Sequence, residues 1–410
     1  MAVASMSRPP ARTIDGAPKS DTPLRVLLII NNLIYGGAET QVIALSRGLA
    51  SRGHEVMLHT LRSDNPRAGD LTGSGVRVVA ARKRWRFDPT LVMAIRAKIA
   101  AFRPDVIHGF LPEGNLYARL AGLRTGIPAL NSERNDNYTL PWKYRAAMKL
   151  TRGMVSGVVA NSHSGARFAR KLFELPSDRV DVVWNGLDVT DLEAKAAAGG
   201  IDPRREFFPT PPARLATLVG AMRPQKDHVM ALRVAEALHR LDARWRVLFV
   251  GDCLPHTRDY AEQVKRRWRD MGLENVVAFA GVRSDAVEIV RQSSVLFSTS
   301  LFEGCPNVVL EAMTVGTPVV SMEYSDIRMI LPRAWQVVAE RDPAEMARAI
   351  VRADRERDEL VALQRQWIDA NGTLGAAVDR LEAVYRRYAL PRAPRGRAGD
   401  QQHRGLMCEY

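Results

Sequence analysis

Two glutamates, Glu303 and Glu311, stand eight positions apart in the segment STSLFEGCPNVVLEAMTVGTPVV. Eight residues of continuous helix would place both carboxylates on one face. Gly304 and Pro306 interrupt such a helix, because glycine disfavours the helical backbone and proline removes a hydrogen-bond donor. The pattern therefore predicts a strand over 295–299, a loop that carries Glu303, and a helix that begins near Asn307 and carries Glu311.

A loop and a helix start of this kind suit a ligand that contains both phosphate and sugar. A helix N-terminus presents free backbone N–H groups and a positive dipole end, which bind phosphate. The acidic side chains beside it are suited to sugar hydroxyls. The alternative is that Glu311 only stabilises the helix and Glu303 is a solvated loop residue.

The wider pattern EGxPxxxxEAMxxGxPVV resembles the signature of the retaining glycosyltransferases of family 4, which have the GT-B fold. The residues that fill constrained positions of this signature are Glu303, Gly304, Pro306, Asn307, Glu311, Ala312, Met313, Gly316 and Pro318. Cys305 stands where an apolar residue is usual. The resemblance covers about residues 25 to 388. It implies an α/β protein with two Rossmann-like, doubly wound domains that face each other across a cleft.

Apolar strand-like segments alternate with amphipathic helices along both halves of the chain, as in parallel doubly wound sheets. In the first half, strands are expected at 25–30, 55–60, 76–80, 106–108, 129–132 and 155–160. The segment ARLATLVG, from Ala213, opens a second cycle of the same kind. At 410 residues the chain is too long for one ordinary core, which favours two domains.

The expected domains follow from this alternation and from a proline-rich stretch at 203–212. We expect a disordered tail over 1–22, an acceptor-binding domain over 23–200 and a nucleotide-sugar-binding domain over 201–374. The resemblance implies that the last helix, over 375–390, crosses back to the first domain. A second disordered tail is expected over 391–410.

Two loops that follow strands are candidates for phosphate binding, since ligands of such sheets bind at the carboxyl ends of strands. Gly36 and Gly37 let backbone N–H groups approach a phosphate, and they resemble the family's GGAE loop, which implies a contact with the donor diphosphate. Arg223 and Lys226 can clamp a diphosphate and neutralise the leaving group. Relatives often carry arginine where this chain has Ala221.

The first domain offers further candidates, His108, Glu113, Asn115 and Arg134. His108 is a candidate catalytic residue, although a histidine at a strand end is also commonly a packed core residue. Relatives often carry a second histidine at the position of Phe110. Glu113 and Asn115 are expected in the acceptor-facing loop, and Arg134 could meet the acceptor or a donor phosphate.

One segment departs from the family pattern. After Val320, many relatives carry a Gly-Gly-Glu cluster, whereas this chain reads Ser325-Asp326-Ile327-Arg328. Any donor contact that this loop makes in relatives is therefore in question here.

The charge of the chain is +14, and most of it lies in the first half. Residues 23–187 contain 24 Lys and Arg against 12 Asp and Glu, a net +12. Such a surface would attract acidic lipid headgroups or a lipid diphosphate, so peripheral contact with an anionic membrane is expected. The alternative is a solvated basic face. Nucleic acid is not expected as a partner, because no known reading motif accompanies the basic residues.

Other features place the protein in the cytoplasm, with the inner face of the cell membrane as a further expectation. The longest apolar runs are of strand length, and the first 22 residues lack the apolar core of a secretory signal. The cysteines are Cys253, Cys305 and Cys408, an odd and scattered set that predicts neither a disulfide framework nor a zinc site.

The resemblance and the residues together predict a retaining glycosyltransferase that acts on a nucleotide-sugar donor, without cofactor or metal. The chain contains no Asp-x-Asp motif of the metal-dependent route. Glu311 would bind the ribose, Arg223 and Lys226 the diphosphate, and Glu303 with residues 304–307 the transferred sugar. The acceptor would be a lipid-linked or polysaccharide precursor of the cell envelope. The alternative is a non-catalytic sugar-nucleotide-binding protein, suggested by Phe110 and Ala221.

Overall fold

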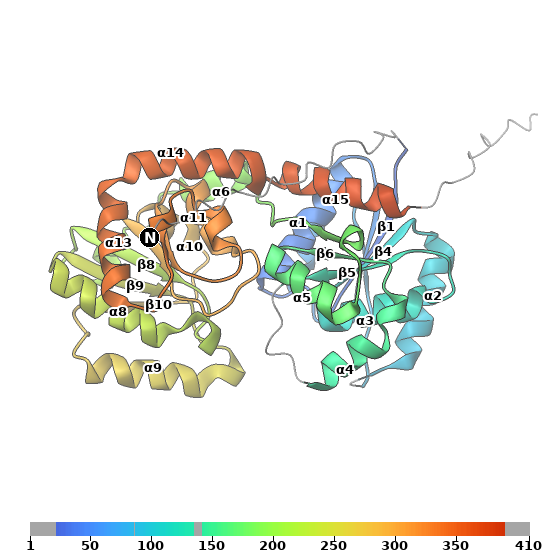
Figure 1. Cartoon of the computed structure of the whole chain (residues 1–410), viewed down its shortest axis with the longest axis horizontal. Helices are drawn as coiled ribbons and strands as arrows, with labels where there is room; N and C mark the ends of the chain where they lie inside the picture. The colour runs from blue at the N-terminus through green and yellow to red at the C-terminus, as the bar shows by residue number, and fades with distance from the viewer. Residues whose placement is uncertain (1–21, 86, 135–141, 390–410) are drawn as a thin grey trace, which may run out of the picture.

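The computed structural model describes residues 22–85, 87–134 and 142–389. The tails that we expected to be disordered therefore lie outside the described residues, apart from Thr22. The chain forms two α/β domains that lie side by side, and the long helices near its C-terminal end run along both of them (Figure 1).

The first domain is built on a seven-stranded sheet with the order β3-β2-β1-β4-β5-β6-β7, in which every pair is parallel. Its strands are β1 (Arg25–Ile30), β2 (Glu55–Thr60), β3 (Arg77–Ala80), β4 (Val106–Phe110), β5 (Ala129–Glu133), β6 (Gly157–Ala160) and β7 (Val180–Val182). Its helices are α1 (Gly37–Ser51), α2 (Pro89–Phe102), α3 (Leu111–Gly122), α4 (Trp142–Leu150) and α5 (His163–Phe173).

The second domain is built on a six-stranded parallel sheet with the order β10-β9-β8-β11-β12-β13. Its strands are β8 (Arg214–Val219), β9 (Trp245–Val250), β10 (Val277–Gly281), β11 (Val295–Ser298), β12 (Val319–Met322) and β13 (Val337–Val338). The remaining helices are α6 (Val189–Ala196), α7 (Pro203–Phe207), α8 (His228–Leu241), α9 (Arg258–Asp270), α10 (Ala286–Arg291), α11 (Asn307–Thr314), α12 (Ile327–Ile330), α13 (Pro343–Arg355), α14 (Arg357–Trp367) and α15 (Leu374–Tyr388).

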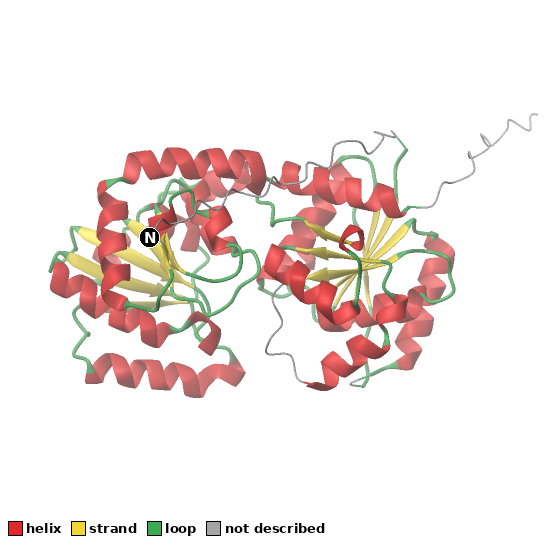
Figure 2. Ribbon diagram, viewed as in Figure 1, coloured by secondary structure: helices red, strands yellow, loops and turns green. Residues whose placement is uncertain are grey.

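Helices cover both faces of each sheet, as Figure 2 shows, so the strands are apolar on both faces. Strand β1 illustrates the reason, because successive side chains of a strand point to opposite faces. Leu28 and Ile30 pack with residues of α1 and α15. Leu27 and Ile29 pack on the other face with residues of α2 and α3. The continuous apolar run of β1 is therefore a consequence of its central, doubly covered position.

The chain crosses between the domains twice, and the two crossing segments are hydrogen-bonded to each other. The backbone of Leu187 accepts from Leu374 N at 2.8 Å and donates to Gly372 O at 2.9 Å. Helix α6 packs against α10 and α11, so the second domain begins before Val189. This differs from the boundary at residue 200 that we expected from the proline-rich stretch. After α14, helix α15 returns to pack on α1 of the first domain.

The local elements around the two glutamates follow the sequence pattern closely. Strand β11 ends at Ser298, and α11 begins at Asn307 directly after Pro306. Glu303 lies in the loop between them, and Glu311 lies in the second turn of α11. The short strands β7 and β13 have no clear signature in the sequence, because two or three residues are too few to show a period.

Candidate functional site

Lys226 and Glu303 form an ion pair at the carboxyl ends of β8 and β11. The Nζ atom of Lys226 lies 2.6 Å from Oε1 of Glu303, and the Ser300 hydroxyl donates to the same oxygen at 3.0 Å. Gly220 makes room for the lysine, because a Cβ at this glycine would lie 2.9 Å from Cε of Lys226. The side chains of the pair are only 15% and 13% exposed. A partly desolvated lysine and glutamate thus occupy the position where a ligand of this sheet is expected.

The two loops that carry the pair are joined into one unit. The Gln225 side chain donates to Phe302 O at 2.7 Å, and Leu301 N donates to Gln225 O at 2.8 Å. The Thr299 hydroxyl donates to Lys226 O at 2.8 Å. Gln225, Thr299 and Ser300 are supporting residues that the sequence analysis missed, because their role depends on two loops that are distant in sequence.

Arg223 and Glu311 lie near the pair but are not part of it. The Nε atom of Arg223 is buried and has no hydrogen-bond partner within the described part of the chain. Burial raises the pKa of Glu311, and the positive charges of Lys195 and Lys226 oppose this shift. Lys226 therefore interacts electrostatically with Glu311 and forms an ion pair with Glu303.

Asn307 connects the start of α11 to the first domain. Its Nδ2 atom donates to the carbonyl of Gly37 at 3.4 Å, and its Oδ1 atom accepts from Gln41 Nε2 at 3.3 Å and from Asn185 Nδ2 at 2.5 Å. Asn185 also donates to Cys305 O at 2.8 Å. The structure thus brings the Gly36-Gly37 turn, at the start of α1, to the loop that carries Glu303.

Gly304 packs directly against the first domain. A Cβ at this position would lie 2.4 Å from Arg134 O and 2.4 Å from Oδ1 of Asn161, so only glycine fits here. The Arg134 guanidinium donates to Oδ1 of Asn185, while its buried Nε has no partner among the described residues. Burial lowers the pKa of Arg134 to about 10, which leaves it cationic at neutral pH. Arg134 therefore lies beside the loop that carries Glu303.

Cys305 is buried beside these groups. Burial raises the pKa of its thiol to about 12, so the thiol is neutral at physiological pH. It therefore packs as a small apolar residue, in agreement with the apolar residue that is usual at this position.

Glu113 lies in a separate polar cluster at the carboxyl end of the first sheet. Its carboxylate is 2.9 Å from Lys83 Nζ and accepts from Asn31 Nδ2 at 3.2 Å. Arg62 lies 3.8 Å away. Asn31 follows β1, Arg62 follows β2 and Lys83 follows β3. The Glu113 carboxylate therefore contacts residues that follow three neighbouring strands of the sheet.

Two sequence-predicted residues do not join the site. His108 is 1% exposed, and its Nδ1 lies 2.7 Å from the Tyr385 hydroxyl of α15. Burial lowers the pKa of His108 to about 3, with a contribution from the charge of Arg134, so the ring is neutral. Asn115 is 2% exposed, and its amide pairs with the backbone N and O of Ser132, both at 3.0 Å. His108 is thus a core residue, which is one of the two roles that the sequence left open, and the buried amide of Asn115 joins α3 to β5.

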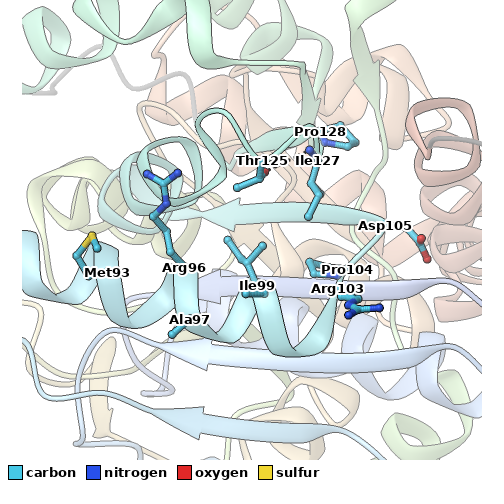
Figure 3. A pocket seen from close by; sticks show the side chains of 11 residues that line it. Met93, Arg96, Ala97, Ile99, Arg103, Pro104, Asp105, Thr125, Ile127 and Pro128 are labelled. Atoms are coloured by element: carbon cyan, nitrogen blue, oxygen red, sulfur yellow. Dashed lines mark hydrogen bonds between the residues drawn. The ribbon is translucent and has the colours of Figure 1, made fainter.

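A cavity of about 760 Å³ lies away from all these residues (Figure 3). It is lined by α2 and by segments that precede β4 and β5, among them Arg96, Asp105 and Pro128. It therefore opens at the amino end of the first sheet, whereas doubly wound sheets bind their ligands at the carboxyl end.

Family models match both halves of the chain. The model described as Glycosyltransferase Family 4 matches residues 35–191, and the model described as Glycosyl transferases group 1 matches residues 213–354. Together they match most of the chain. This chain belongs to the family 4 glycosyltransferases. It is therefore an enzyme that transfers a sugar.

Curated relatives of this glycosyltransferase match over most of its length. It is 26% identical over 390 residues to the D-inositol 3-phosphate glycosyltransferase of Thermomonospora curvata, with 85% of this chain and 90% of that protein covered. It is 23% identical over 363 residues to a subunit of the phosphatidylinositol N-acetylglucosaminyltransferase of Arabidopsis thaliana, with 80% of this chain and 74% of that protein covered.

Solved structures share the fold of the glycosyltransferase, which is therefore GT-B. Anabaena HepE in complex with UDP superposes with a TM-score of 0.72 at 16% identity, covering 88% of this chain and 99% of that one. Sucrose-phosphate synthase of Thermosynechococcus elongatus superposes with a TM-score of 0.72 at 16% identity, covering 89% and 98%. Two Rossmann-like domains with parallel sheets are the architecture that we expected.

Two further findings concern metals and membranes. Within the described ranges, the glycosyltransferase has no cluster of three His, Cys, Asp or Glu that could hold a metal ion. A reaction without metal stays a prediction.

Among the helices that the structure describes, none is both long enough and apolar enough to cross a bilayer.

Proposed function

We propose that this glycosyltransferase retains the configuration of the sugar that it transfers, taking it from a nucleotide-sugar donor bound to the second domain. The observation that carries the proposal is the ion pair of Lys226 with Glu303. The loop of Glu303 leads into Asn307, which contacts the start of α1. The presence of UDP and UDP-glucose in the structures of Anabaena HepE supports a donor of this class. The same family membership disfavours a non-catalytic scaffold.

In this proposal the bound donor replaces the contact between Lys226 and Glu303 with contacts from each residue to the donor. Lys226 leaves Glu303 and binds the diphosphate together with Arg223, whose Nε lacks a partner within the described ranges. Glu303 and the backbone of residues 304–307 then accept and orient the sugar, and Glu311 binds the ribose. The reaction is accelerated because the two cations stabilise the charge that develops on the leaving diphosphate.

Arg134 is assigned here to the donor, not to the acceptor. Its guanidinium donates to Asn185, which in turn donates to Cys305 O, so the guanidinium lies beside the loop proposed to bind the sugar. Burying an arginine whose N–H groups are not all hydrogen-bonded raises the free energy of the folded protein, and an anionic ligand would offset this increase. We propose that Arg134 supplies a cation from the first domain when the donor is bound.

The acceptor is proposed to bind at the carboxyl end of the first sheet, near Glu113 and Lys83. The cations Arg62 and Lys83 around Glu113 favour an acceptor that carries both hydroxyls and an anionic group. The names of two relatives include an inositol phosphate and a phosphatidylinositol, which supports such an acceptor. A lipid-linked or polysaccharide precursor of the cell envelope has this chemistry.

Helix α4 is the proposed contact with an anionic membrane on the cytoplasmic side. Trp142 is 73% exposed and Leu150 is 86% exposed, although large apolar side chains are usually covered. The exposed cations around them are Lys143, Arg145, Lys149 and Arg152. Exposed apolar groups within a basic helix are typical of segments that lie at a lipid surface.

The purified protein can be tested with a panel of sugar nucleotides. We expect slow hydrolysis of one donor, measured by mass spectrometry, and transfer when a phosphorylated or lipid-linked acceptor is added. NMR of the product would establish the anomeric configuration. Donor binding without hydrolysis or transfer would contradict the proposal, and an inverted product would contradict the retaining mechanism.

A further inference from the structure

Asp326 is a buried carboxylate of the second domain that contacts the first domain. It lies between β12 and α12 and is 3% exposed. Its Oδ2 accepts from the backbone N of His163 at 2.5 Å and lies 2.9 Å from His163 Nδ1. Its Oδ1 accepts from the backbone N of Ser164 at 3.2 Å, and Trp184 Nε1 lies 3.5 Å from Oδ2.

These contacts complete the N-terminus of α5, which begins at His163. The first backbone N–H groups of a helix have no partner within the helix. Ser162 satisfies one of them through a hydrogen bond from Gly165 N at 3.0 Å. Asp326 satisfies those of His163 and Ser164, and its negative charge complements the helix dipole. The cap of a first-domain helix is therefore completed by a residue of the second domain.

Three further features support a specific contact between Asp326 and the start of α5. Burial acts to raise the pKa of Asp326, but the hydrogen bonds from His163 and Ser164 outweigh it and hold the pKa below its usual range. The preceding residue, Ser325, has a φ of +40°, a conformation that non-glycine residues rarely adopt. The same first-domain segment also contacts the loop of residues 304–307, since Asn161 lies against Gly304. One stretch, 161–164, thus contacts two loops of the second domain.

We propose that Asp326 is a positioning residue that latches the second domain to the N-terminus of α5. The latch holds the loop of residues 304–307 against Arg134 and Asn161 while the sugar is transferred. This inference rests on the proposed function of that loop. It also assigns a role in domain positioning to the 325–328 segment, which departs from the family pattern.

The latch can be tested with Asp326→Ala and Asp326→Asn, with Asp342→Ala as the matched control. Asp342 is also a helix-capping aspartate of the second domain, but it caps α13 within its own domain by accepting from Ala344 N at 2.8 Å. Small-angle X-ray scattering would report domain separation, with and without UDP. Steady-state kinetics with the donor found in the sugar-nucleotide panel would report kcat and KM separately.

We expect Asp326→Ala to increase the radius of gyration and to lower kcat by about tenfold or more, since the charge-assisted hydrogen bonds that join the two domains are lost. The donor KM should change much less, because the donor binds the second domain. Asp326→Asn should give a radius of gyration and a kcat between those of the wild type and of Asp326→Ala. His163→Ala should change both quantities less than Asp326→Ala, because it retains the backbone N–H groups.

Unchanged scattering in Asp326→Ala, or an equal loss of kcat in Asp342→Ala, would overturn the latch. If the wild-type protein transfers no sugar, the proposed function fails, whereas the scattering comparison still decides whether Asp326 holds the domains together. Variants that do not fold are recognised by their circular dichroism, and Asp326→Asn, which preserves the side-chain shape, then carries the test.

Discussion

The Nζ atom of Lys226 lies 2.6 Å from Oε1 of Glu303, so the cation proposed for the diphosphate and the carboxylate proposed for the sugar neutralise each other when no donor is present. Each charge is partly desolvated, and an unpaired charge at this depth would be costly. The pair therefore stabilises both groups in place, and in the proposed function the donor separates them.

Lys226→Ala is expected to reduce donor turnover by about 10²–10³-fold. The substitution removes a preorganised positive charge that would stabilise the negative charge of the leaving diphosphate. The measurement is the initial rate of donor hydrolysis or transfer. Lys98→Ala, which removes an exposed lysine of α2, is the control and should retain activity. Wild-type rates in Lys226→Ala would contradict the assignment of this lysine.

Glu311→Gln is expected to stabilise the fold at neutral pH and to weaken donor binding. Burial raises the pKa of Glu311, so its ionised form opposes folding at pH values above that pKa, and the penalty disappears as the pH falls below it. The melting temperature of the variant should exceed that of the wild type at pH 7.5, and the difference should vanish in acid. The exposed Glu274→Gln should show neither effect. Equal melting temperatures at pH 7.5 would contradict a strained carboxylate.

Gly304→Ala is expected to lower kcat/KM by about tenfold or more while each domain stays folded, because the new Cβ forces the loop that carries Glu303 away from the Arg134 carbonyl and the Asn161 side chain. Gly69→Ala is the matched control, since a Cβ there meets no atom within 4 Å. Kinetics and thermal melting would be measured for both. A normal kcat/KM in Gly304→Ala would show that the observed packing is not needed for transfer.

His108→Ala should act on stability and not on the chemical step. Truncating a buried ring costs about 3–5 kcal/mol, and Tyr385→Phe, which removes only its hydroxyl partner, should cost about 1 kcal/mol. The folded pKa of His108 is about 3, against about 6.5 in an unfolded chain. Its neutral burial therefore contributes stability above pH 6.5 that is lost as the pH falls toward 3, and His108→Ala should weaken this acid dependence in denaturant titrations.

For folded His108→Ala, kcat should stay within a few-fold of the wild-type value. A loss of several orders of magnitude in kcat, without a matching loss of stability, would restore the catalytic role that the sequence suggested.

Replacing Trp142 and Leu150 by alanine should reduce binding to anionic vesicles while leaving donor hydrolysis unchanged. Both side chains are highly exposed on a basic helix, and their removal takes away the apolar part of the contact. Co-sedimentation with vesicles of anionic and of neutral lipid, at low and high salt, measures this. Leu241→Ala, which removes an exposed leucine of the second domain, is the control. Equal binding of all variants, or none by the wild type, would contradict a membrane role for α4.

The sequence by itself determined the local structure around the candidate site. Gly304 and Pro306 interrupt any helix between Glu303 and Glu311, and this property of the backbone does not depend on the rest of the fold. Strand β2 coincides with the predicted range because its apolar and β-branched residues stand between turn signals. The family signature likewise consists of neighbouring residues, so it could be read directly.

Only the tertiary structure decided which of these residues meet. His108 packs on Tyr385, 277 positions away, and Asp326 caps a helix 163 positions away in the other domain. Arg134 lies at the loop that carries Glu303 because the two domains pack against each other at Gly304. A strand-end histidine or a loop aspartate has the same local pattern whether it faces a cleft, a core or a second domain. Its partner is set by the packing of segments distant in sequence, which minimises buried, unpaired polar groups over the whole molecule.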